Sequence, residues 1–136
     1  PPVDLYGTAA KLARRSIYGY IDRMDVSPLL TTFDFPNPDA SSAARSQTTV
    51  PPQALHFMNS VAVNDEARRL ALRPEGVAVD QPAARIELLH QLVLARKPTA
   101  EELRWALKFV GPTPSLDQWQ RFAHALFMTN EFAFVD

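Results

Sequence analysis

The segment Arg14–Asn59 constrains the fold most, because its prolines interrupt regular secondary structure at short intervals. These prolines are Pro28, Pro36, Pro38, Pro51 and Pro52. Proline lacks a backbone N–H and biases the preceding residue away from helical angles, so we expect no regular helix from Pro28 to Pro38. We predict an ordered, extended, proline-rich arm over residues 1–50, with one short helix at Val3–Ala13 and an extended stretch at Arg14–Tyr20.

Helical periodicity begins near Thr49 and predicts a kinked helix or a pair of helices over Pro52–Arg73. Asn59 and Ser60 interrupt the apolar pattern with residues that favour helix ends. A first apolar stripe consists of Ala54, Leu55, Met58 and Val61. The residues expected to pack inward after the interruption are Val63, Ala67, Leu70 and Ala71.

Three more helices are predicted in the second half of the chain. The first covers Gln81–Ala95 with Asp80 as its cap, and the others start after Thr99 and Ser115. Thr99 with Glu102, and Ser115 with Gln118, have the spacing of capping boxes. The expected inward positions are Ile86, Leu89, Val93, Leu103, Ala106, Leu107, Val110, Leu116, Trp119, Phe122, Ala123 and Leu126.

These patterns predict a mainly α fold. Residues 51–136 are expected to form a four- or five-helix bundle, and residues 1–136 to be a single domain or a domain fragment. The loops between the last three helices are short, which favours antiparallel neighbours. After Thr129, we expect a docked C-terminal tail with Phe132, Phe134 and Val135 alternating into a groove.

The composition excludes several classes of site. Of the 136 residues, 46% are apolar, which is enough for one core of ordinary size. A formal net charge of -1 gives no broad basic field, so we expect no nucleic-acid partner. Because the chain has no cysteine, disulfides, thiolate zinc sites, iron–sulfur clusters and covalently attached c-type haem are excluded. We expect no cofactor in this chain.

We expect no targeting signal within this sequence. No apolar run of about 18 residues is present, so we expect no membrane span. The start PPVDLYGTAAKLARR lacks the basic end and apolar run of a signal peptide, and it begins with Pro1-Pro2. We interpret the chain as a C-terminal piece of a longer protein whose targeting signal lies upstream.

Asp34 and four arginines form a candidate binding cluster. The arginines are Arg14, Arg15, Arg23 and Arg45. Guanidinium and carboxylate groups pair bidentately, so the cluster is first interpreted as pinning the arm to the helical body. The alternative is that one or two arginines grip an acidic group, such as a sulfated or carboxylated glycan. The candidate binding residues are Arg14, Arg15, Asp34, Arg45 and His56.

Aromatic residues and histidines leave further alternatives open. The aromatic set forms either a sugar-stacking platform or part of the core, and core is favoured. It consists of Tyr18, Tyr20, Phe33, Phe35 and Phe57. His56, His90 and His124 are spaced 34 residues apart, the tetratricopeptide period, but their neighbours lack that repeat's pattern. We expect hydrogen-bonded core histidines rather than a metal site.

Four sequence strings resemble a domain of unknown function from large secreted planctomycete proteins, where it follows cytochrome c-like domains. The strings are RRSIYGYIDR (14–23), LLTTFDFPNP (29–38), RSQTTVPPQALHFMN (45–59) and TNEFAFVD (129–136), supported by LARKPTAEEL (94–103). They occur in the same order as in that family. The resemblance implies a secreted or periplasmic protein, and it implies no activity.

The sequence contains no recognised nucleophile motif and no glycine-rich phosphate loop. We therefore predict a noncatalytic structural or interaction module of a larger secreted multidomain protein. Its expected partners are upstream domains of the same polypeptide, another protein, or a second copy of itself. One alternative is a polysaccharide-binding module that uses the Arg-rich and aromatic N-terminal third. Another is a part of a haem-containing oxidoreductase whose catalytic domain lies upstream.

Overall fold

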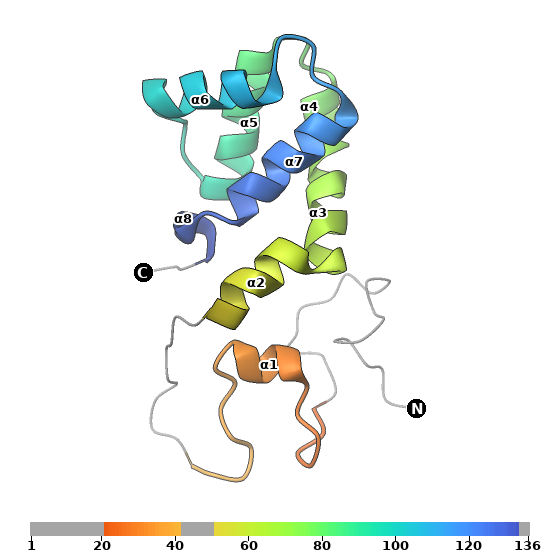
Figure 1. Cartoon of the computed structure of the whole chain (residues 1–136), viewed down its shortest axis with the longest axis vertical. Coiled ribbons are helices and arrows are strands. Elements are labelled where there is room, and N and C mark those ends of the chain that lie inside the picture. Colours follow the sequence, from red (N-terminus) through yellow and green to blue (C-terminus); the bar gives the residue numbers. More distant parts are fainter. Residues whose placement is uncertain (1–20, 42–50, 134–136) are drawn as a thin grey trace. The chain divides into compact units, whose positions relative to one another are not determined.

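The structure is a computed structural model that describes residues 21–41 and 51–133, and in these ranges it contains eight helices and no strand (Figure 1). The prediction of a mainly α fold is confirmed. The chain divides into two compact units, Pro1–Ala54 and Leu55–Asp136. The predicted helix Val3–Ala13 and the extended stretch Arg14–Tyr20 lie outside the described residues.

Most of the helices lie in the second unit, and two of them are single turns. Their bounds are α1 (Pro28–Thr32), α2 (Pro51–Asn59), α3 (Val61–Ala71), α4 (Pro74–Val77), α5 (Pro82–Leu94), α6 (Ala100–Val110), α7 (Leu116–Phe127) and α8 (Asn130–Ala133).

Helix α1 begins at a proline, so the expectation of no regular helix from Pro28 to Pro38 is wrong. Pro28 occupies the first turn after the N-cap residue Ser27, where the N–H that proline lacks would have no intrahelical partner. The hydroxyl groups of Thr31 and Thr32 donate to the carbonyl of Pro28, at 3.0 and 2.8 Å. Pro28 therefore starts a helix, and only Pro36 and Pro38 of this segment fall in non-helical chain.

Asp34 closes the C-terminal end of α1 in a Schellman motif. Its φ is 56°, the left-handed conformation that aspartate tolerates better than most side chains. The N–H of Phe35 donates to the carbonyl of Leu30 at 3.0 Å, and the N–H of Asp34 donates to the carbonyl of Thr31 at 3.4 Å. These are the two bonds that define the motif, so the Phe33-Asp34-Phe35 sequence serves to end α1.

The described part of the predicted arm contains turns as well as α1. The N–H of Met24 donates to the Asp22 carboxylate at 2.9 Å, and the N–H of Asp39 donates to the Asn37 side chain at 2.9 Å. Both are Asx turns, in which a side chain replaces a backbone acceptor. Buried Gln53 adds a longer-range bond, because its amide donates to the Thr32 carbonyl at the end of α1 at 3.0 Å.

Helices α2 and α3 form the predicted pair, separated at Ser60. Ser60 is the N-cap residue of α3, but its side chain makes no capping bond. Ala67 and Ala71 are fully buried, as predicted for the inward face. The first apolar stripe is different, because Leu55, Met58 and Val61 are exposed. The break at Ser60 also places Val61 on α3 and the other members of the stripe on α2, so they are not one stripe of a single helix.

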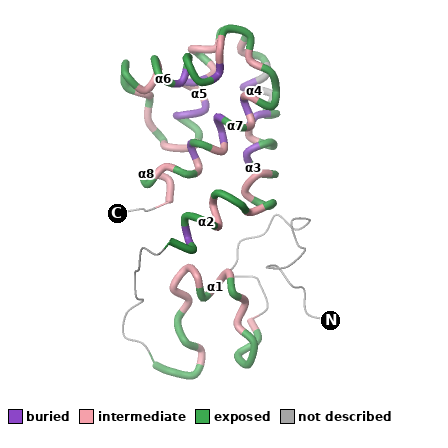
Figure 2. The backbone as a smooth tube through the Cα atoms, in the orientation of Figure 1, coloured by how far each residue is buried: buried purple, intermediate pink, exposed green. Residues whose placement is uncertain are grey.

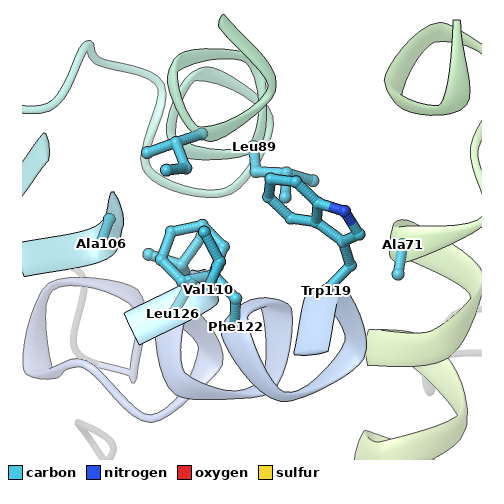
Figure 3. Packing of buried hydrophobic residues seen from close by; sticks show 8 residues of the cluster. Ala71, Leu89, Ala106, Val110, Trp119, Phe122 and Leu126 are labelled. Atoms are coloured by element: carbon cyan, nitrogen blue, oxygen red, sulfur yellow. The ribbon is translucent and has the colours of Figure 1, made fainter. Parts of the chain in front are cut away.

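The core of the second unit lies among α3, α5, α6 and α7 (Figures 2 and 3). Helix α7 packs against the other three and contributes Trp119, Phe122 and Leu126. Figure 3 places the Trp119 indole between α5 and α3, near Leu89 and Ala71. All three α7 side chains were predicted to point inward. Leu107 and Leu116, which were also predicted inward, are 37% and 40% exposed.

The starts of α6 and α7 are both capping boxes, as predicted. The Thr99 hydroxyl accepts from the Glu102 N–H at 3.2 Å, while the Glu102 carboxylate accepts from the Thr99 N–H at 2.7 Å. Ser115 and Gln118 make the same reciprocal pair at 3.3 and 2.6 Å. Each box satisfies backbone donors that a helix start leaves without intrahelical partners.

Helix α5 begins differently from the prediction. Its N-cap residue is Gln81 and Pro82 follows in the first turn, so Asp80 is not the cap. Proline provides the start, because its φ is already helical. At the other end, Ala95 adopts φ 56° and turns the chain out of the helix. In Figure 1, α6 lies across α5 rather than antiparallel beside it. The short loop between the two helices therefore did not predict their relative orientation.

Replacing Phe122 with Ala is expected to reduce the free energy of unfolding by about 3–5 kcal/mol, because the ring is 6% exposed and fills the core cluster. Urea denaturation followed by circular dichroism measures the loss. Leu116→Ala, on the exposed first turn of the same helix, is the control and should lose less than about 1 kcal/mol. Equal losses for the two variants would contradict the described core.

Replacing Ala95 with Gly is expected to stabilise the second unit by up to about 1 kcal/mol, because glycine adopts positive φ without the Cβ penalty. Ala95 is exposed, so little packing is lost. Ala125, exposed within α7, is the matched control. Ala125→Gly should destabilise by about 1 kcal/mol, because glycine weakens a helix interior. A lower denaturation midpoint for Ala95→Gly would contradict the left-handed end of α5.

Candidate functional site

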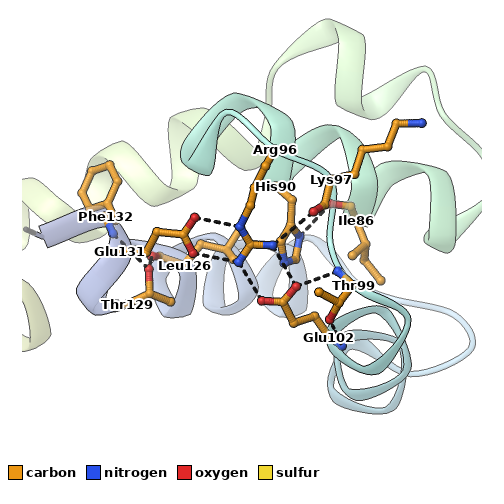
Figure 4. Close-up of polar contacts among 10 residues, drawn as sticks. All are labelled: Ile86, His90, Arg96, Lys97, Thr99, Glu102, Leu126, Thr129, Glu131 and Phe132. Carbon is orange, nitrogen blue, oxygen red and sulfur yellow. Dashed lines mark hydrogen bonds and ion pairs between the residues drawn. The ribbon is translucent and has the colours of Figure 1, made fainter. Parts of the chain in front are cut away.

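The most extensive polar cluster in the described part of the chain is centred on Arg96 (Figure 4). The left-handed residue Ala95 ends α5, and Arg96 follows it directly. Glu102 comes from the first turn of α6 and Glu131 from α8. The cluster therefore joins the α5–α6 connection to a short helix that lies 35 residues further along the chain.

All five N–H groups of the Arg96 guanidinium have an acceptor. Nε and Nη2 donate to the two carboxylate oxygens of Glu131, both at 2.7 Å. Nη1 and Nη2 donate to the two oxygens of Glu102, at 2.9 and 2.8 Å. The remaining donor of Nη1 binds the carbonyl of Lys97 at 3.1 Å. A planar guanidinium suits this arrangement, because its donors are fixed in a fork that matches carboxylates.

The same bonds shift the pKa values of the three groups. Hydrogen bonds from Arg96, and then the one from the Thr99 N–H, lower the pKa of Glu102 from 4.5 to about 2. Hydrogen bonding to Arg96 also lowers the pKa of Glu131. The pKa of Arg96 is raised, first by its bonds to Glu102 and then by those to Glu131. All three groups therefore remain charged at neutral pH.

The Arg96 cluster is a structural tie rather than a ligand site. Every guanidinium donor is used within the protein, and Glu102 also accepts from the capped end of α6. The sequence predicted the bond between Thr99 and Glu102 because the two residues are three positions apart. It did not reveal the bond between Arg96 and Glu131, since no local spacing connects them.

The binding cluster predicted from the sequence is largely outside the described residues. Arg14, Arg15 and Arg45 belong to the ranges that the structure does not describe. Asp34 lies in the first compact unit as the left-handed residue after α1, and half-buried His56 lies on α2 in the second unit. The proposed convergence of these residues stays a prediction.

His90 and His124 both bind backbone carbonyls. Nδ1 of buried His90 donates to the Ile86 carbonyl at 3.0 Å, and its ring lies 5.8 Å from the Phe122 ring. Nε2 of half-buried His124 donates to the Phe57 carbonyl at 2.8 Å. The prediction of hydrogen-bonded core histidines is confirmed for His90. Within residues 21–41 and 51–133, no group of three or more His, Asp or Glu side chains is placed to hold a metal ion.

Arg85 ties α5 to the end of α3. Its guanidinium lies 4.4 Å from the centre of the Trp119 ring, and Nη2 donates to the Ala71 carbonyl at 2.7 Å. Burial lowers the pKa of Arg85, and its Nε is a buried donor that has no hydrogen-bond partner among the described residues. The stacked indole and the carbonyl acceptor account for the position of this cation within the fold.

Helix α6 presents an aromatic and basic surface to solvent, which we call the α6 surface. It consists of Arg104, Trp105, Lys108 and Phe109. Trp105 is 56% exposed and Phe109 is 55% exposed, although both are large apolar side chains. The cationic groups of Arg104 and Lys108 lie 5.8 and 5.4 Å from the centre of the Trp105 ring. This surface was not predicted from the sequence, although Trp105 and Phe109 fall outside the predicted inward stripe.

The family comparison covers most of the chain. Residues 4–110 match the model of the family PSD1, described as "Protein of unknown function (DUF1553)". The chain belongs to this family. The PSD1 match includes Arg96, Glu102 and the whole of α6, and it ends before Glu131. Searches of the curated proteins and of the solved structures gave no significant match.

None of the described helices of this PSD1 protein has both the length and the apolar character that are needed to cross a bilayer. The longest described helix, α5, has 13 residues.

Replacing Glu102 with Gln is expected to flatten the pH dependence of stability below pH 4.5. The folded-state pKa of Glu102 is about 2, below the ordinary 4.5, so its charge stabilises the fold above pH 4.5. This stabilisation is lost as the pH falls through about 2. Urea denaturation between these pH values measures the effect. A remaining slope is expected because the pKa of Glu131 is also lowered.

The choice of glutamine keeps the capping box, since Gln118 fills the same role at the start of α7. Glu101→Gln is the matched control, because the one ion pair of exposed Glu101 among the described residues is with exposed Arg104, at 3.6 Å. Its pH profile should follow that of the unchanged protein. A Glu102→Gln profile as steep as that of the unchanged protein would contradict the role of the Arg96 cluster.

Proposed function

We propose that this PSD1-family chain is a noncatalytic interaction module of a larger secreted multidomain protein. The observation that carries the proposal is the α6 surface, where Trp105 and Phe109 are both more than half exposed. Exposed aromatic side chains next to arginine are the composition of interface hot spots. Contiguous apolar side chains on a folded helix also favour association, because burying them removes apolar area from water.

The organisation of α6 supports this interpretation. Ala106 and Val110 are buried in the core, while Trp105 and Phe109 lie on the outward side of the same helix. The Arg96 cluster and the capping box fix the start of the helix. A rigid helix that carries apolar residues on two sides is suited to a second contact, because little conformational entropy remains to be lost on binding.

The proposed partners are upstream domains of the same polypeptide. This part of the proposal rests on the resemblance to planctomycete proteins in which the domain follows cytochrome c-like domains. The secreted or periplasmic location that we propose rests on the same resemblance. In that arrangement, redox chemistry belongs to the upstream domains and this chain contributes a contact surface.

The test is to express the chain and the rest of its polypeptide separately and to measure their association by calorimetry. A saturable complex with a Kd on the order of 1 µM or tighter, equivalent to about -8 kcal/mol, is expected for a specific interface. Binding should be lost when the chain is unfolded in urea. A reading frame that encodes no further domain, or the absence of any complex, would refute the proposal.

A further inference from the structure

We propose that the α6 surface is a docking site for a peptide segment that carries apolar side chains next to carboxylates. This inference deepens the proposed function, because it names the contact surface and the chemistry of its partner. It rests on the geometry of α6 and on the charges around Trp105.

The aromatic residues of the α6 surface form one continuous ridge. Trp105 and Phe109 are four residues apart, so they lie on neighbouring turns of one face of α6. Phe109 is anchored from behind, because its ring lies 6.4 Å from the ring of buried Phe122. Packing on Phe122 therefore holds the Phe109 side chain in place, and the exposed parts of the ridge offer a partner two adjacent aromatic contacts.

The charge of the α6 surface selects the partner. Lys108 makes no ion pair with any residue in the part of the chain that the structure describes. Arg104 contacts Glu101 at 3.6 Å, with both side chains more than 70% exposed, so this pair is weak. The surface thus carries an excess positive charge beside its aromatic ridge. A segment with Asp or Glu next to Leu, Ile or Phe would be complementary in both respects.

A peptide fits this surface better than a sugar. Stacking of a sugar ring needs an open aromatic face with hydrogen-bonding groups at its edge. Here the cationic groups of Arg104 and Lys108 both lie within 6 Å of the Trp105 ring centre, where they compete for that face. Carboxylates of a peptide can bind these cations from outside while apolar side chains cover the exposed edges of Trp105 and Phe109.

The test uses a phage-displayed library of random 16-residue peptides, selected against the immobilised 136-residue chain. The expected peptides combine apolar residues with Asp or Glu. One selected peptide is then synthesised with a fluorescent label, and its Kd is measured by anisotropy. Trp105→Ala should weaken binding at least tenfold. Because Trp105 is 56% exposed, this variant should keep its fold, which circular dichroism checks.

Two further variants test the assignment of surface and charge. Leu72→Ala, which removes another exposed apolar side chain at the end of α3, should leave the Kd unchanged. Reversing both charges, in the double variant Arg104→Glu and Lys108→Glu, should abolish binding of the acidic peptide. A new selection against this double variant should give basic peptides instead.

Several outcomes would overturn the inference. They are a selection without enrichment, enriched peptides that bind Trp105→Ala as tightly as the unchanged chain, and a charge reversal without effect. Polygalacturonate that binds through Lys108 while no peptide is selected would also overturn it, in favour of an anionic polysaccharide site. If Trp105→Ala still binds the rest of the polypeptide, the interaction module stands and its contact lies on another surface.

Discussion

The guanidinium of Arg96 makes the hydrogen bonds on which the C-terminal region depends. It binds Glu102 and Glu131 through four hydrogen bonds, and thereby connects the end of α5, the start of α6 and α8 (Figure 4). A single-turn helix such as α8 is too short to be stable alone. Its position follows from this tie and from packing of the Phe132 ring, which lies 4.9 Å from Phe127 and 6.2 Å from Phe57.

These contacts explain residue types in the strings that carry the family resemblance. Arg96 and Glu131, from two of these strings, are joined by an ion pair. Phe57, from a third string, lies beside them, because its carbonyl accepts from His124 and its ring packs on Phe132. In segment 29–38, the turn at Asp34 ends α1. Residue types that appeared specific in the sequence thus either connect two elements or end a helix.

Local features were predictable from the sequence, and distant ones were not. Both capping boxes were found because their partners are three residues apart. Buried Trp119, Phe122 and Leu126 followed from helical periodicity. The start of α1 was missed because a proline that breaks a helix interior also begins a helix well. The bond between Arg96 and Glu131 was missed because its partners are 35 residues apart, a separation that only tertiary folding closes.

The candidate surface was missed for a related reason. Periodicity identifies an apolar face, but the number of neighbouring elements decides whether that face is buried. Helix α6 has Ala106 and Val110 against the core and Trp105 and Phe109 toward solvent. Phe109 contacts buried Phe122, but more than half of each of the two aromatic residues stays exposed, although aromatic side chains bury large apolar areas when they are covered. Since Lys108 lies 5.4 Å from the centre of the Trp105 ring, an acidic and apolar segment would satisfy both the uncovered area and the charge.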